Sequence, residues 1–303
     1  MGKEIILLEE VNKSFSGTQV INKLSFSVQK GEILGILGPN GSGKTTTIRL
    51  INGVIYPDSG RITLAGYDPI SDGDEVRRRC GVLTESAGLY ENMTALDNLL
   101  FFADLYCVKD PMQRAKKLLA DFGLTGAAEK KVGIFSTGMK KRLGIAKALL
   151  HNPEILFLDE PTTGLDPEGT RDLIKYIKEL NHKYQVTILL ATHLLKQVQD
   201  LCHRFIFIHH GQLLETGTFR ELEAKYLKEV SLKVETNLQI SEEYFSGYPI
   251  ESKEPGYLRF RIQNKAEIPL LLKKILALAP IYSAEIIGRD LETLYFKIRE
   301  EKA

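Results

Sequence analysis

A phosphate-binding loop is the sequence feature that most constrains this chain. Residues 38–45 read GPNGSGKT and match the pattern G-x-x-x-x-G-K-[ST] at every specified position. The apolar run 32–37 predicts a buried strand leading into the loop, and 46–51 predicts the helix that leaves it. Glycines let backbone N–H groups point inward, and a helix N-terminus adds a partial positive charge. The residues assigned to nucleotide binding here are Gly38, Pro39, Asn40, Gly41, Ser42, Gly43, Lys44, Thr45 and Thr46.

Within this loop, two side chains have distinct chemical roles. We expect the ammonium of Lys44 to reach the β- and γ-phosphates of a nucleotide, and the hydroxyl of Thr45 to ligate Mg²⁺. A glycine-rich turn before a helix is the alternative, and the flanking strand and helix patterns argue against it. Nucleotide binding is therefore the first functional prediction.

Composition is that of a globular protein. Of the 303 residues, 43% are hydrophobic and 26% are charged, which suits one large or two ordinary domains. The formal net charge of +1 gives no reason to expect nucleic acid as a partner. No apolar run is long enough for a transmembrane helix, and the N-terminal residues do not follow the basic-then-apolar order of a signal peptide. Cys80, Cys107 and Cys202 are not spaced as metal ligands. We expect a cytoplasmic location.

Strand and helix patterns alternate over residues 1–222, which predicts an α/β domain with a mostly parallel core sheet and an antiparallel part. The apolar run 155–158 suits a central strand covered on both faces. Helical periodicity fills 94–150, within an insert of about 86–150. The other expected strands are 5–9, 24–28, 62–64, 81–84 and 186–190, and 205–208 with 212–215 are expected to form an antiparallel pair. A turn is expected at 13–17. Helices are expected at 112–121, at a segment that begins at Ser136 and at a segment that begins at Pro167.

The pattern changes after about residue 222, and we predict a small α+β domain over 223–303. Alternating apolar residues predict strands around 230–234 and 258–262, and 265–278 suits a helix. The polar segment 241–256 contains glycine and proline and predicts a loop. Residues 290–298 fit two periods: Leu291, Leu294, Tyr295 and Ile298 suit a helix, whereas Leu294, Phe296 and Ile298 suit a strand.

Two carboxylates follow the apolar strand 155–158 directly. Asp159 can reach Mg²⁺ through water, and Glu160 can polarise an attacking water molecule. A strand that ends in Asp-Glu is a weak signal by itself, because a solvated strand end has the same sequence. Behind a phosphate-binding loop it indicates phosphoryl transfer.

The segment 136–142 reads STGMKKR and lies at an expected helix N-terminus. Alone, it would suit a serine-capped helix with a basic face. In this order along the chain it resembles the signature sequence of ATP-binding cassette (ABC) ATPases, usually written LSGGQ. Ser136 and Gly138, the positions that contact phosphate in that family, are kept, whereas Phe135, Thr137 and Met139 depart from it.

Further landmarks of the same family follow in register. Residues 163–166 resemble the D-loop and end in Asp166, and His193 matches the switch histidine that contacts the γ-phosphate. Phe15 matches the aromatic residue that stacks on adenine, although a core phenylalanine is a serious alternative there. Glu85 stands where the family usually has the Q-loop glutamine.

The resemblance, which covers about 1–222, implies the ATP-hydrolysing subunit of an ABC exporter. It implies ATP and Mg²⁺ as cofactors, Glu160 as general base, and Thr45, Glu85 and Asp159 at the metal. It also implies an integral membrane permease as partner. The chain itself would be cytoplasmic and would lie on the inner face of the cell membrane. A second copy of the chain would complete each site with its signature segment. The end of the chain resembles the last helix of ABC ATPases that serve drug, antibiotic and lantibiotic exporters, which favours the helix at 290–298.

Two other functions are consistent with a cassette of this kind. ABC ATPases also act on ribosomes or DNA, but such chains usually carry two cassettes or long coiled coil, and this chain has one phosphate-binding loop, no sustained heptads and no basic tract. The second alternative function is that of a regulator that binds nucleotide but does not hydrolyse it. The presence of Lys44, Asp159, Glu160 and His193 argues against it.

Overall fold

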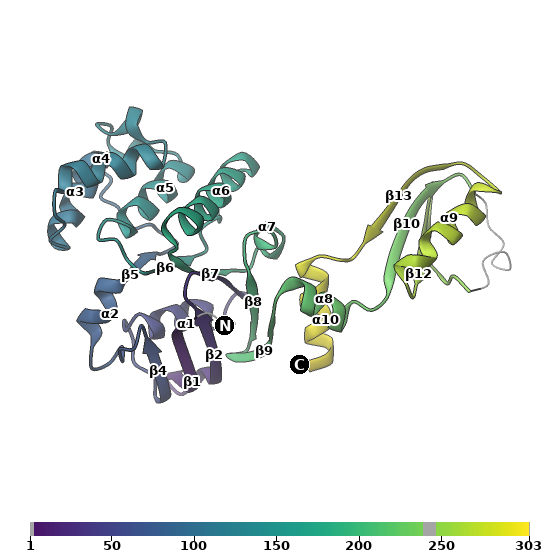
Figure 1. The fold of residues 1–303 in the computed structure, drawn as a ribbon, viewed down its shortest axis with the longest axis horizontal. Helices are drawn as coiled ribbons and strands as arrows, with labels where there is room; N and C mark the ends of the chain where they lie inside the picture. Colours follow the sequence, from purple (N-terminus) through teal and green to yellow (C-terminus); the bar gives the residue numbers. More distant parts are fainter. Residues whose placement is uncertain (1–2, 239–246, 303) are drawn as a thin grey trace. The chain divides into compact units, whose positions relative to one another are not determined.

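A computed structural model describes residues 3–238 and 247–302 of the chain (Figure 1). The chain divides into two compact units, Met1–Thr216 and Gly217–Ala303, and each is described by itself. The expected boundary after residue 222 falls inside helix α8 (Phe219–Tyr226). Because α8 buries Leu222 and Tyr226 and contacts α10 (Leu291–Lys302), it belongs to the second unit, and the units separate before it.

A six-stranded sheet with the order β5-β6-β7-β3-β8-β9 forms the centre of the first unit. Strands β3 (Ile33–Leu37), β6 (Ile155–Asp159) and β7 (Thr187–Thr192) are buried along their whole length, as expected of parallel strands covered on both faces. β5 (Cys80–Leu83) and β8 (Arg204–His209) extend the parallel part, and β9 (Gln212–Gly217) follows β8 after two residues, which leaves room for a hairpin only. The helices of this part are α1 (Lys44–Ile51), α6 (Pro167–Tyr184) and α7 (Leu195–Val198).

A three-stranded antiparallel sheet, β2-β1-β4, packs its apolar side chains into the same core. β1 (Glu4–Phe15) and β2 (Thr18–Gln29) are longer than expected, and β4 is Ser59–Leu64. The predicted turn at 13–17 is therefore too long, because the strand continues to Phe15 and the chain reverses at 16–17. Helix α2 (Gly73–Arg79) was not predicted, since it buries Val76 alone and shows no apolar period.

The helical insert is present, and the central sheet separates it from the antiparallel sheet in Figure 1. It contains α3 (Ala95–Leu105), α4 (Pro111–Asp121) and α5 (Thr137–Ala148), with short 3₁₀ turns η1 (Thr125–Ala127) and η2 (Val132–Ile134) between the last two. The expected helix from Ser136 is confirmed: the Ser136 hydroxyl accepts a hydrogen bond from the backbone N–H of Met139 and caps α5.

The second unit contains a four-stranded antiparallel sheet with the order β11-β12-β10-β13. Its strands are β10 (Val230–Thr236), β11 (Ile250–Glu254), β12 (Tyr257–Ile262) and β13 (Ile281–Ile287). Helix α9 (Ile268–Leu276) follows the 3₁₀ turn η4 (Lys265–Glu267) and buries Leu271 and Ile275 against the sheet.

Three expectations for this unit had different outcomes. The predicted loop 241–256 is wrong at β11, which pairs with β12 through its backbone, and its residues 241–246 lie outside the described part of the chain. β13 was missed because its side chains are largely exposed on both faces. The helix at 290–298 is confirmed as α10, which buries Leu291, Leu294, Tyr295 and Ile298.

A partly buried ion pair links Arg204 of β8 to Glu32, the residue before β3, and can be tested. Arg204 on β8 donates from Nε to Glu32 Oε1 at 2.7 Å and from Nη2 to the Ser27 carbonyl at 2.6 Å. Arg204→Met should lower the free energy of unfolding by about 3 kcal/mol, because Glu32 would stay buried without its cation. Urea denaturation of the variant measures this loss.

The double variant Glu32→Gln/Arg204→Met is the control. It removes the charge that the single variant leaves uncompensated, so it should be more stable than Arg204→Met. A double variant of equal or lower stability would show that the unpaired carboxylate does not cause the loss.

Candidate nucleotide site

The phosphate-binding loop connects β3 to α1 in a conformation that requires glycine. Gly41 and Gly43 have φ angles of 78° and 107°, in the left-handed region that glycine adopts readily. Gly38 is required for another reason: a Cβ there would lie 2.2 Å from the backbone oxygen of Ile208. The loop therefore packs directly against the end of β8, and no side chain fits between them.

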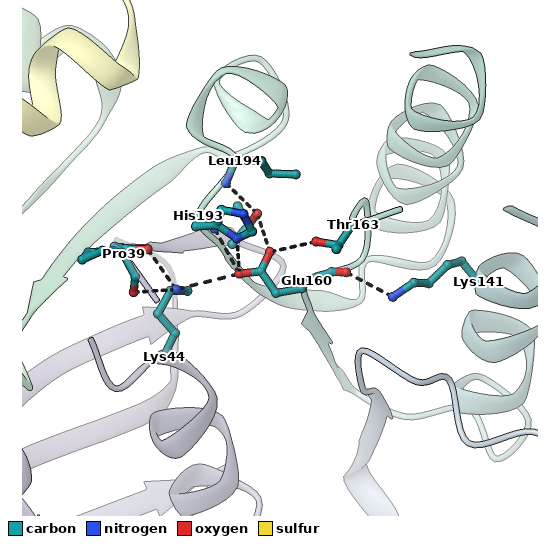
Figure 2. A network of polar contacts seen from close by, with 9 residues as sticks. Pro39, Lys44, Lys141, Glu160, Thr163, His193 and Leu194 are labelled. Carbon is teal, nitrogen blue, oxygen red and sulfur yellow. Dashed lines mark hydrogen bonds and ion pairs between the residues drawn. The ribbon is translucent and has the colours of Figure 1, made fainter. Parts of the chain in front are cut away.

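Lys44 is buried, and its ammonium points into the loop (Figure 2). Nζ donates to the carbonyls of Gly38 at 2.9 Å and Pro39 at 3.0 Å. It lies 3.8 Å from Glu160 Oε1. Burial lowers the pKa of Lys44, and the negative charges of Glu160 and Asp159 oppose this shift. The loop thus holds a desolvated cation next to two carboxylates.

The carboxylate of Glu160 is the centre of a hydrogen-bond network (Figure 2). Oε2 accepts from the hydroxyls of Thr192 at 3.0 Å and Thr163 at 3.3 Å. Oε1 accepts from the backbone N–H of His193 at 3.1 Å and lies 2.9 Å from its Nδ1. The structure therefore brings together Lys44, Glu160 and His193, the three residues expected to be catalytic.

Asp159 has the environment of a metal ligand. It is 7% exposed, and its Oδ1 has no hydrogen-bond partner among the described residues. Burial raises the pKa of Asp159, whereas a hydrogen bond from the Thr45 side chain lowers it. A buried carboxylate oxygen without a donor, beside a threonine hydroxyl, fits a hard divalent cation such as Mg²⁺.

The rest of such a coordination shell would not come from protein carboxylates. The described part of the chain contains no group of three or more His, Cys, Asp or Glu residues placed to hold a metal ion. In nucleotide enzymes, Mg²⁺ is usually held by one or two protein oxygens and completed by phosphate and water.

The signature segment lies apart from the phosphate-binding loop. Ser136, Gly138 and Asp166 line an open pocket of about 400 Å³ that contains no residue of 38–45. The Asp166 carboxylate accepts from the backbone N–H of Gly169 at 2.7 Å and caps α6. Within one chain these residues therefore form a second surface that does not contact the loop.

Phe15 and Glu85 are both exposed. The Phe15 side chain is 44% exposed at the end of β1, with Lys13 Nζ 5.4 Å from the ring centroid, so it is not a core residue. Glu85 lies in the turn after β5. The Glu85 side chain is exposed, and its backbone carbonyl accepts from Lys141 Nζ at 2.8 Å. The contact of Glu85 with a metal ion stays a prediction.

Lys141 is a site residue that the sequence analysis missed. It is 4% exposed on α5, and its Nζ donates to the backbone carbonyl of Glu160 at 3.1 Å (Figure 2). The same Nζ donates to the backbone carbonyl of Glu85 at 2.8 Å. Burial lowers the pKa of Lys141, opposed by the charges of Glu85, Asp159 and Glu160. Its spacing from the buried Ile145 and Ala148 places it on the apolar stripe of the helix, a signal that could have identified it.

The fold and the site define a P-loop ATPase cassette. Comparisons with known proteins identify the family of cassettes to which the chain belongs. A family model described as ABC transporter matches residues 21–163. The bacitracin transport ATP-binding protein BcrA of Bacillus licheniformis is 36% identical over 84% of both chains. The linearmycin resistance ATP-binding protein LnrL of Bacillus subtilis is 37% identical over 71% of this chain and 69% of its own.

Among solved structures, a dimeric, post-hydrolysis ATP-binding cassette bound to ADP and Pi is similar over 71% of this chain and 98% of its own, with 25% identity and a TM-score of 0.65. The chain belongs to the ABC transporter family and is similar to ATP-binding proteins of that family. The predicted fold class is confirmed. In the described residues, no helix combines the length and the apolar character that crossing a membrane requires.

The contact of Lys141 with Glu160 can be tested against its neighbour in sequence. Lys141→Met removes the donor to the partly buried carbonyls of Glu85 and Glu160 and releases the backbone that holds Glu160. ATP turnover should therefore fall about tenfold, roughly 1.4 kcal/mol of barrier. The KM for ATP should change little, because Lys141 does not face the loop. Steady-state ATPase kinetics measure both constants.

Lys140→Met is the matched control, since Lys140 forms an exposed ion pair with Glu91 and does not reach Glu160. It should keep the parental turnover. Equal losses in the two variants would assign the effect to the charge of the helix and not to the buried contact.

Proposed function

We propose that this chain is the Mg²⁺-dependent ATP-hydrolysing subunit that powers a separate membrane permease of an exporter. The observation that carries the proposal is the Glu160 carboxylate, held by Thr192 and His193 and placed 3.8 Å from the loop lysine. A carboxylate in that position can accept a proton from a water molecule that attacks the terminal phosphate.

Each residue of the site has a role in this proposal. Lys44 exchanges its two loop carbonyls for the β- and γ-phosphates, and the loop N–H groups hold the same oxygens. Thr45 and Asp159 hold Mg²⁺, which neutralises phosphate charge when bound. Glu160 is the general base, and His193, exposed beside it, contacts the γ-phosphate. The exposed ring of Phe15 stacks on adenine.

The separate signature pocket supports a head-to-tail pair of chains. Ser136 and Gly138 lie away from the loop of their own chain, so they contact the nucleotide of a second copy. The dimeric state of the solved cassette, bound to ADP and Pi, is consistent with this arrangement. Each nucleotide would then lie between the loop of one chain and the signature helix of the other.

The membrane partner follows from the names of the relatives, which are a bacitracin transport and a linearmycin resistance ATP-binding protein. We place the contact with the permease around Glu85 and the helical insert, where Tyr90 (49%) and Phe101 (37%) are exposed and in edge-to-face contact. The cassette would act on the cytoplasmic side of the membrane, and Gly217–Ala303 would be an accessory domain. Nothing in the comparisons favours the alternative of action on ribosomes or DNA.

Substitution of the proposed base separates binding from hydrolysis. Glu160→Gln keeps the shape of the side chain but accepts no proton, so ATP should bind and remain uncleaved. Because ATP would bridge two chains, this variant should accumulate as a dimer with MgATP, measured by light scattering. Lys44→Ala is the control and should bind nucleotide too weakly to dimerise. Glu160→Gln that stays monomeric at saturating MgATP would contradict the head-to-tail pair.

The glutamate at the Q-loop position makes a prediction of its own. If Glu85 approaches the metal once MgATP is bound, Glu85→Gln should raise the Mg²⁺ concentration needed for half-maximal turnover, since a carboxylate is a stronger ligand than an amide. The rate at saturating Mg²⁺ should change by less than about tenfold. A magnesium titration of both proteins decides the matter, and superimposable curves would leave Glu85 with no metal role.

A further inference from the structure

Strand β13 is an edge strand with little protection. It is the last strand in the order β11-β12-β10-β13 and pairs with β10 alone among the described strands. Its sequence IYSAEII contains one charge and neither proline nor lysine, two residues that often block an edge. The register shift at Tyr282 is its one irregularity, and residues 283–287 pair with β10 in regular register. Tyr282 is 64% exposed and Ile286 is 37% exposed. An edge of this length and composition normally has a cover in the native assembly.

The pairing register gives this edge an apolar face and a polar face. Ala284 lies opposite Val234, and Ile286 lies opposite Leu232, so these residues share the face on which α9 builds the core. Tyr282 is the extra residue at a register shift between the pairs Ser283–Glu235 and Ile281–Thr236, and it has no partner of its own on β10. Ser283 and Glu285 project from the opposite face.

The strand is complementary to itself. In an antiparallel pair centred on Ala284, Tyr282 of each copy lies opposite Ile286 of the other, and Ser283 lies opposite Glu285. Aromatic with β-branched is a favourable cross-strand pair, and no like charges are directly opposed. The Ser283 hydroxyl donates to Glu235 Oε2 of its own sheet at 2.9 Å, so it adds no donor to the new contact. We propose that β13 pairs with β13 of a second copy about a two-fold axis at Ala284, which joins the two four-stranded sheets into one continuous sheet.

A second copy suits this edge better than an unrelated protein. With MgATP bound, the proposed pairing of the cassettes would bring two chains together and raise the effective concentration of the partner strand, so this part of the argument rests on the proposed function. Without nucleotide, the β13 contact forms by itself. The β13 contact itself uses no nucleotide. The head-to-tail contact requires MgATP and the β13 contact does not, so the two contacts can be tested separately.

Cysteine cross-linking tests the register in the full-length chain. The parent is Cys107→Ser, because Cys107 is the exposed cysteine and Cys80 and Cys202 are not exposed. Opposed residues of an antiparallel pair have Cα atoms about 4.5–5.5 Å apart, within disulfide range. Ala284→Cys should form a disulfide-linked dimer under mild oxidation without ATP. In Ile286→Cys, the two cysteines are four residues out of register, roughly 13 Å apart, and should not cross-link.

A charge swap at the axis gives a second readout, and Ala284 is exposed enough to accept it. Ala284→Lys and Ala284→Glu should each be monomeric without nucleotide, because each places two like charges opposite one another. A mixture of the two variants should recover the dimer by light scattering. Both variants should keep ATP hydrolysis and, combined with Glu160→Gln, the MgATP-dependent dimer, so failure of the β13 contact is distinguishable from failure of the proposed function.

Several results would overturn the proposal. Equal cross-linking of Ala284→Cys and Ile286→Cys would show a non-specific contact. A parent protein that is monomeric without ATP, together with no cross-link at position 284 at any nucleotide state, would show that β13 is covered by another part of the chain or by the permease. A mixture of the charge variants that stays monomeric would do the same.

Discussion

The balance of buried charge around Glu160 is the constraint on which the rest of the site depends. Lys44 is desolvated at the base of the loop, and two carboxylates, Asp159 and Glu160, compensate its charge. Glu160 also has a φ angle of 48°, in the left-handed region, which costs on the order of 1–3 kcal/mol for a residue with a side chain. Neighbouring donors and three fully buried strands hold this arrangement in place. Such strain and charge persist at a site where the chemistry needs them.

Helix α5 contributes to two different sites. Its N-terminal residues Ser136 and Gly138 lie on the signature pocket, whereas Lys141, little more than one turn further, donates to the backbone of Glu160 and of Glu85. A helix of this length moves as a rigid element, so a displacement of its N-terminus also moves the ammonium that contacts Glu160. The signature segment thus has a physical connection to the catalytic carboxylate of its own chain, in addition to its proposed contact with the other chain's nucleotide.

The elements that could be predicted from the sequence are those whose residue types are determined by local backbone geometry or by burial. The loop glycines, the buried strands β3, β6 and β7 and the capped helix α5 all fall in this class. Helix α2, with one buried side chain, and β13, exposed on both faces, lack an apolar period and could not be found in this way. The role of Lys141 was missed because it depends on two carbonyls more than fifteen residues away in sequence. Glu85 was assigned by position alone, and its contact with a metal ion stays a prediction.

Symmetry links the two proposed contacts between copies. A head-to-tail pair of cassettes, in which each chain gives its loop and its signature helix to the other, has a two-fold axis, and so does β13 paired about Ala284. Both contacts close within one dimer when the two axes coincide. If they did not coincide, each chain would bind a different neighbour through each contact, and the assembly would be larger than a dimer, either a closed ring or an open chain. Closure of both proposed contacts within one dimer is therefore a condition on symmetry, and the charge variants at Ala284 test it separately from the head-to-tail pair.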